Sequence, residues 1–140
     1  MALDKARLET VAYAIENRTN GDPGFSARRY AVKPRGPQGW AAPETDLSKI
    51  DESTFLDIAG WTCYQYPDLC DRVVDSAGFT WPYAKGMQYY ANARRILGLS
   101  LTEADLLFAG LEDGRLVVDL ENYTAKQAVE DLRALAALAQ

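Results

Sequence analysis

The sequence predicts a mainly α-helical fold: a compact single-domain bundle of about six short helices spanning residues 1–140. Two observations carry this prediction. Apolar residues recur at helical spacing in several separate stretches, and residues suited to capping stand at the start of these stretches. The chain has 140 residues, of which 48% are hydrophobic, so one domain of this length can bury a substantial core. We therefore expect a Pro/Gly-rich loop at about residues 33–46 and at most a minor β-hairpin.

The first helix is expected over residues 3–16, where Leu8, Val11, Ala12 and Ile15 repeat every three to four residues. A cluster of Asn, Gly, Asp and Pro then ends it. Residues 25–32 fit either a short helix or an extended segment. Three prolines and two glycines in the following stretch predict an irregular loop at residues 33–46, since proline lacks the donor that helices and ladders need.

The middle of the chain predicts three further helices. A continuous apolar stripe marks residues 55–66, with Asp51 or Ser53 as its cap. A short helix is expected over residues 69–78, where a glycine can end it. Another is expected over residues 80–98, because a proline in its first turn costs no hydrogen bond.

The last third carries the clearest local signals. Ser100 stands three residues before Glu103, the spacing of a capping box, so a helix is expected over residues 101–109. A turn signal within residues 111–120 allows a small hairpin. Thr124 and Gln127 form a second capping-box pair ahead of an Ala/Leu-rich final helix.

The composition excludes several kinds of chemistry. The chain has no histidine, so neither a Ser–His nor a Cys–His couple can form. Its two cysteines, Cys63 and Cys70, are expected to be free buried thiols, with a disulfide or a shared metal as the alternative. No nucleotide-binding, phosphate-binding or hydrolase motif is present, and the acids fit solvated helix faces. We therefore assign no catalytic, cofactor-binding or metal-binding residue, and an enzyme is the less favoured class.

Neither a membrane span nor a leader is expected. No apolar run approaches the roughly 20 residues needed to cross a bilayer, and the first residues lack a signal-peptide pattern. The prediction is a cytoplasmic protein without membrane attachment.

The charge distribution points to a candidate binding segment. Residues 1–50 hold eight basic against six acidic residues, whereas residues 51–140 hold seven against fourteen. Between Gly24 and Pro43 lies an acid-free basic stretch, with four basic residues and no acidic one. It contains a tryptophan near arginines, a composition common at protein interfaces. The predicted partner-binding residues are Arg28, Arg29, Tyr30, Lys33, Arg35 and Trp40. The alternatives are a solvated loop and, for Trp40, an anchor folded back onto the core.

Two other functional classes stay open at this point. Arginines with aromatics can hold phosphates and stack bases, which suits a nucleic-acid-binding module. Conversely, acidic clusters could mimic nucleic acid; the acids concerned are Asp68, Asp71, Asp75, Glu112 and Asp113. An enzyme using carboxylate or thiol chemistry at a helix junction is the remaining alternative.

Two stretches form a recognisable combination: Ile58-Ala-Gly-Trp61 and the Leu-Gly-Leu-Ser…Glu-Ala…Leu-Phe pattern within residues 96–108, followed by an Ala/Leu-rich helix at 125–139. In this combination the chain resembles a group of small uncharacterised proteins of actinobacteria and their phages. Many members carry a Cys-Gly-Thr…Cys stretch where this chain has Thr54-Phe-Leu56, so no thiol function is carried over. The resemblance implies a phage or actinobacterial origin.

These observations lead to one expected function. We expect a small protein that binds another macromolecule, in the first place a protein, such as a phage accessory protein acting on a host component. No cofactor is expected, and the partner and oligomeric state are left open.

Overall fold

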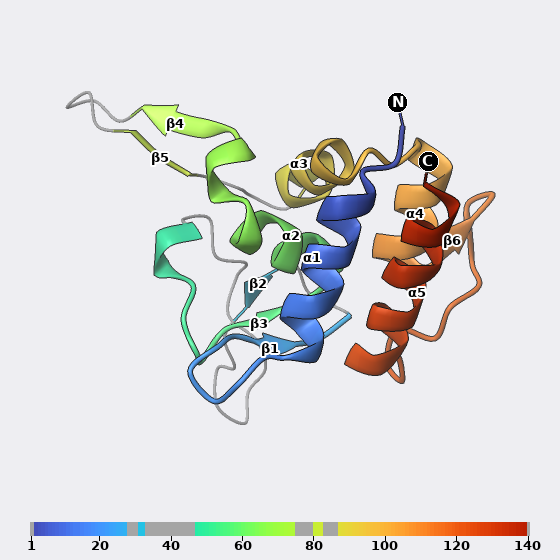
Figure 1. Ribbon diagram of the computed structural model, residues 1–140, viewed down its shortest axis with the longest axis horizontal. Coiled ribbons are helices and arrows are strands. Elements are labelled where there is room, and N and C mark those ends of the chain that lie inside the picture. The colour runs from blue at the N-terminus through green and yellow to red at the C-terminus, as the bar shows by residue number, and fades with distance from the viewer. Residues whose placement is uncertain (1, 28–30, 33–46, 75–79, 83–86, 140) are drawn as a thin grey trace.

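The computed structural model describes residues 2–27, 31–32, 47–74, 80–82 and 87–139 of the chain (Figure 1). Within these residues the fold is mainly helical, as predicted, with five α-helices and two single-turn 3₁₀ helices. The α-helices are α1 (Lys5–Glu16), α2 (Ile58–Gln65), α3 (Met87–Leu97), α4 (Leu101–Ala109) and α5 (Ala125–Leu138). The 3₁₀ helices are η2 (Leu47–Lys49) and η3 (Pro67–Leu69).

Short strands in the segments between the helices form three small sheets. In the first, the central strand β3 (Phe55–Leu56) pairs in parallel with β1 (Gly24–Phe25) and antiparallel with β2 (Ala31–Val32). The second is an antiparallel ribbon of β4 (Arg72–Val74) and β5 (Thr80–Pro82), with Val73 opposite Trp81. The third is a hairpin of β6 (Leu111–Glu112) and β7 (Arg115–Leu116).

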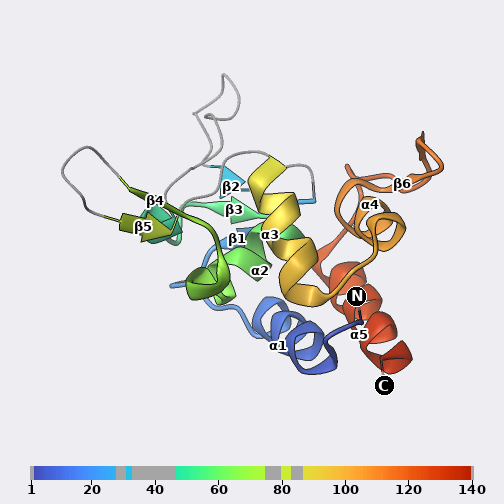
Figure 2. The ribbon, with the colours of Figure 1, turned by 90° about the horizontal axis from the view of Figure 1, so that it is seen from above.

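The helices surround one apolar core. The most extensive helix contact joins α1 to α5, and the next joins α2 to α3. In Figure 1 the start of α1 and the end of α5 lie at the same end of this pair, so the two helices are antiparallel. Among the side chains that the structure describes, Trp61 of α2 and Tyr89 of α3 are the largest that are fully buried. The view from above places the β4–β5 ribbon at the opposite end of the molecule from α5 (Figure 2).

Side-chain caps fix the starts of four helices. The Ser100–Glu103 and Thr124–Gln127 capping boxes are both formed, which confirms the two starts predicted from sequence. Asp4 caps α1 by accepting from the Arg7 backbone N–H. Helix α2 begins later than predicted, because the buried carboxylate of Asp57 caps it and the preceding residues 55–56 are in β3.

One predicted helix is replaced by other structure, and another begins later than predicted. The prediction of a helix over residues 69–78 is wrong, because η3 is followed there by strand β4. The helix expected from residue 80 begins only at Met87, after β5. The β-branched and aromatic residues of both segments suit strands, and their mutual pairing decides the outcome. Strands therefore occur well outside residues 111–120, where the predicted hairpin is confirmed.

The predicted loop at residues 33–46 lies outside the described residues. None of the helices that the structure describes is long and apolar enough to cross a membrane.

Candidate functional site

The partner-binding residues predicted from sequence cannot be placed in the fold. Arg28, Arg29, Tyr30, Lys33, Arg35 and Trp40 all lie outside the described residues. The binding surface predicted for this segment therefore stays a prediction from the sequence.

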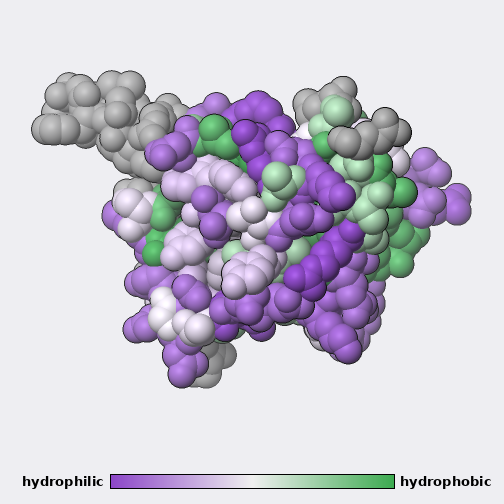
Figure 3. All heavy atoms as spheres, in the orientation of Figure 1, coloured by the Kyte–Doolittle hydropathy of each residue, from purple (hydrophilic) through white to green (hydrophobic). Residues whose placement is uncertain are grey.

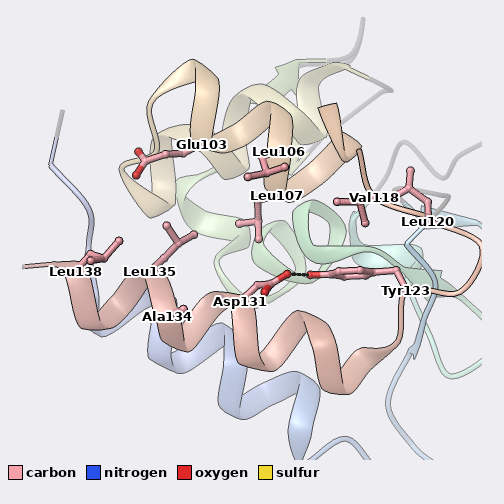
Figure 4. A pocket seen from close by; sticks show the side chains of 10 residues that line it. All are labelled: Glu103, Leu106, Leu107, Val118, Leu120, Tyr123, Asp131, Ala134, Leu135 and Leu138. Atoms are coloured by element: carbon pink, nitrogen blue, oxygen red, sulfur yellow. Dashed lines mark hydrogen bonds between the residues drawn. The ribbon is translucent and has the colours of Figure 1, made fainter. Parts of the chain in front are cut away.

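The described residues contain an open apolar cleft between α4 and α5, which we call the α4–α5 groove (Figure 4). Its volume is about 310 Å³. Helix α4 contributes one wall, α5 the other, and the segment that connects the β6–β7 hairpin to α5 closes one end. The lining residues are Glu103, Leu106, Leu107, Val118, Leu120, Tyr123, Asp131, Ala134, Leu135 and Leu138.

The groove exists because α4 and α5 pack chiefly on other helices. The main neighbour of α5 is α1, whereas α4 packs on α3 and α2. Neither helix therefore covers the apolar face that the other presents. The wall from α4 carries Leu106 and Leu107, and the wall from α5 carries residues spaced three or four apart, including Leu135 and Leu138.

Helix α5 is apolar on two faces. One face, with Ala128, Val129, Leu132 and Ala136, is buried in the core. The other face lines the groove. In the sequence of α5, apolar residues cover a wider part of the helix circumference than one contact with the core needs. This width is the signal that could have identified the groove. A helix with one core-facing face accounts for the same periodicity, so the sequence pattern alone did not predict the groove.

A hydrogen bond fixes the polar end of the groove. The Tyr123 hydroxyl donates to Oδ2 of Asp131, and the ring lies along the base of the groove (Figure 4). The same ring lies 6.4 Å, between centroids, from that of Phe25 in β1. Burial, followed by the hydrogen bond to the Asp131 carboxylate, raises the pKa of Tyr123 far above its ordinary value. Tyr123 therefore stays a neutral donor and holds the Asp131 carboxylate in place.

The apolar surface extends beyond the hollow itself. Leu106 is 43% exposed and Leu138 is 71% exposed, although both are large apolar side chains. Figure 3 shows hydrophobic residues gathered at the right-hand edge of the molecule, where Figure 1 places α4, α5 and β6. Contiguous exposed apolar surface of this kind marks interaction sites more often than isolated leucines do.

A second hollow, between α1 and α5, has a different character. Its volume is about 440 Å³, and charged side chains supply most of its lining. Arg133 of α5 makes a bidentate ion pair there with Glu16 of α1, with both N–O distances at 2.8 Å. This ion pair connects α1 to α5, so we assign the charged residues of this hollow a structural role.

The two cysteines lie close together in the core. Both are free and buried, as predicted. The Cys70 thiol lies 3.9 Å from the Cys63 carbonyl oxygen, and the Cys63 thiol lies 3.6 Å from that of Tyr89. A hydrogen bond with Cys70 and burial raise the pKa of Cys63 well above its ordinary value. Cys63 is therefore kept as a thiol, whereas nucleophilic catalysis needs the thiolate.

Other polar groups of the core serve the fold. Burial raises the pKa of Asp57 well above its usual range, although backbone N–H groups, that of Gly60 first, oppose the shift. Asn92 accepts from the Arg95 side chain at 2.7 Å, but its buried Nδ2 has no hydrogen-bond partner. Among the described residues, no group of three or more Cys, Asp or Glu is arranged to hold a metal ion.

Comparisons with known proteins add no further assignment. The chain matches no protein-family model, no curated protein and no solved structure.

Proposed function

We propose that this protein acts by binding another protein, and that the α4–α5 groove is a contact surface. The observation that carries this proposal is the pair of unpartnered apolar helix faces, with Leu106 and Leu138 left exposed at the edge of a cleft. Fully burying an exposed leucine is worth about 1.5–3 kcal/mol, and a partner that covers Leu106 and Leu138 gains the share of this that corresponds to their exposed fractions, 43% and 71%.

The groove also has the make-up of a specific contact. Its apolar walls supply affinity, while the fixed Tyr123–Asp131 pair supplies a polar point that constrains orientation. An enzyme is less well supported, because the carboxylates that line the groove have structural roles. Glu103 accepts from the backbone N–H of Ser100 in the capping box, and Asp131 accepts from Tyr123.

The sequence-based contact surface at Arg28–Trp40 and the phage accessory role are part of the same proposal. The first is supported by the acid-free basic stretch, and the second by the resemblance at residues 58–61 and 96–108. Both surfaces can be tested together.

Photo-crosslinking tests the proposal in cells that produce the protein. A benzophenone amino acid is placed at Leu106 in the groove, at Trp40 in the basic segment, and at Leu69 as a control. Leu69 is a matched control because it is 40% exposed, close to the value for Leu106, and lies outside the groove. We expect a protein adduct from Leu106 and none from Leu69.

The adduct is then identified by mass spectrometry, and the purified partner is titrated against the full chain. Leu106→Gln should weaken the complex about tenfold, and Leu69→Gln should leave it unchanged. No adduct from Leu106, or equal adducts from Leu106 and Leu69, would reject the groove as a contact surface. An adduct from Trp40 alone would move the contact to the basic segment.

A further inference from the structure

We infer that the occupant of the α4–α5 groove is an amphipathic helix of the partner, with basic residues flanking its apolar face. This inference rests on the proposed binding function and specifies the chemistry of the partner. Shape and charge support it independently.

The shape of the groove fits a helix. Its two long walls are themselves helices, and the α5 wall runs from Asp131 to Leu138 with lining residues three or four apart. Seven residues of helix rise about 10 Å. A partner helix with apolar anchors at positions i, i+3 or i+4, and i+7 spans the same length. Such anchors pack between the ridges of both walls, as in other helix-in-groove complexes.

The length of exposed apolar surface favours a helix over a small molecule. Leu138 and Leu106 lie at the rim, and both extend the apolar surface outside the hollow. A molecule that only fills the hollow would contact these leucines from inside and leave their outward-facing surface in water. A helix that lies along the groove covers them.

The charge around the groove selects a basic partner. Residues 101–140 carry eight acidic and three basic side chains, a balance of −5 that equals the net charge of the whole chain. Two of the acids, Glu103 and Asp131, line the groove itself. One of the three bases, Arg133, is already paired with Glu16. The lining of the groove itself therefore carries two acidic side chains and no basic one, on a segment of net negative charge.

The same charge disfavours a second copy of this chain as the occupant. Two copies meeting through this face would bring their acidic surroundings together, and like charges across an interface repel. A helix rich in Lys or Arg instead gains attraction and faster association.

Three synthetic 18-residue peptides test the inference on the full chain. The first places Leu on one helical face and Lys elsewhere. The second replaces every Lys with Glu. The third keeps the composition of the first, but its order is scrambled so that Leu no longer lies on one face. Binding is followed by fluorescence anisotropy of labelled peptide at two salt concentrations.

We expect the basic amphipathic peptide to bind, and its affinity to fall as salt is raised. The acidic and scrambled peptides should bind at least about tenfold more weakly. Leu106→Gln should weaken the basic peptide about tenfold, and the control Leu69→Gln should not. Asp131→Asn keeps an acceptor for Tyr123 but removes one charge, so it should weaken binding mainly at low salt. Circular dichroism checks that each variant is folded.

Three results would overturn the inference: no binding of the basic amphipathic peptide, equal binding of the acidic peptide, or equal binding of the scrambled peptide. These results would not affect the conclusion drawn from the crosslinking experiment. A protein adduct from Leu106 without peptide binding would mean that the groove binds a partner of other chemistry. Absence of that adduct would reject the groove as a contact surface, and absence of an adduct from Trp40 as well would reject the proposed function.

Discussion

Replacing Gly98 with alanine tests how the chain packs at the junction of α3 and α4. Gly98 has a φ of +72°, and a Cβ added there would lie 2.0 Å from the backbone oxygen of Ala2. The first residues therefore run directly against this turn. The Asp4 backbone N–H, which opens α1, donates to the Leu97 carbonyl oxygen at 3.0 Å beside it.

The expected cost has two parts. A left-handed backbone with a Cβ costs about 1–2 kcal/mol. The clash adds to this, because a backbone oxygen cannot rotate away as a side chain can, so residues 2–4 have to move. Moving them loses the hydrogen bond between Asp4 and Leu97, a net contribution of about 1 kcal/mol. We expect Gly98→Ala to lower the free energy of unfolding by about 2–3 kcal/mol in total.

Gly114→Ala supplies the matched control. Gly114 has a φ of +76°, but a Cβ there would meet no atom within 4 Å. Its replacement therefore carries the backbone cost alone, about 1–2 kcal/mol. Urea unfolding followed by tryptophan fluorescence measures both variants. Equal destabilisation by the two substitutions would refute the close approach of residues 2–4 to Gly98.

Three further outcomes are expected. Burial raises the pKa of Asp57 in the folded protein, so its carboxyl group holds a proton more tightly in the folded protein than in the unfolded chain. Asp57 therefore lowers the free energy of unfolding as pH rises from about 4. Asp57→Asn, which can still cap α2, should therefore gain stability relative to the wild type as pH rises in urea titrations, and a pH-independent difference would contradict this. Replacing both Cys63 and Cys70 with alanine should cost a few kcal/mol through small cavities but leave partner binding intact, whereas loss of binding by a stable double variant would favour a thiol or metal role. Replacing the arginines of the basic segment, Arg28, Arg29 and Arg35, with Glu should weaken the binding of an anionic partner and reduce the salt dependence of that binding in titrations. Unchanged affinity would exclude this segment as the contact surface.

The two capping boxes in the sequence predicted the starts of α4 and α5 correctly. The Ser100–Glu103 and Thr124–Gln127 boxes depend only on residues three apart, so the sequence alone determines them. The β4–β5 ribbon was missed because its pairing joins residues that are up to ten positions apart, such as Arg72 and Pro82. Val73 and Val74 follow Leu69 and Cys70 at helical spacing but also suit a strand, and the partner strand decides.

The groove was missed for a related reason. Periodicity identifies the apolar residues of a helix, but it does not say which of them another helix covers. Leu132 and Leu135 have the same chemistry and lie on the same helix. Leu132 is fully buried, whereas Leu135 lines the α4–α5 groove. Only the arrangement of α1, α4 and α5 separates the two roles.

The pairing of α1 with α5 also sets an order for folding during synthesis. The two helices meet across most of the chain; Glu16 and Arg133, which bridge them, are 117 residues apart. While the ribosome is still making the middle of the chain, the apolar face of α1 lacks the helix that later covers it. Closing so long a loop is slow, because its entropy is lost before the contact is gained. The part of α1 that packs on α5 therefore stays uncovered in the nascent chain until α5 emerges, and a chaperone that recognises apolar segments has that interval in which to bind.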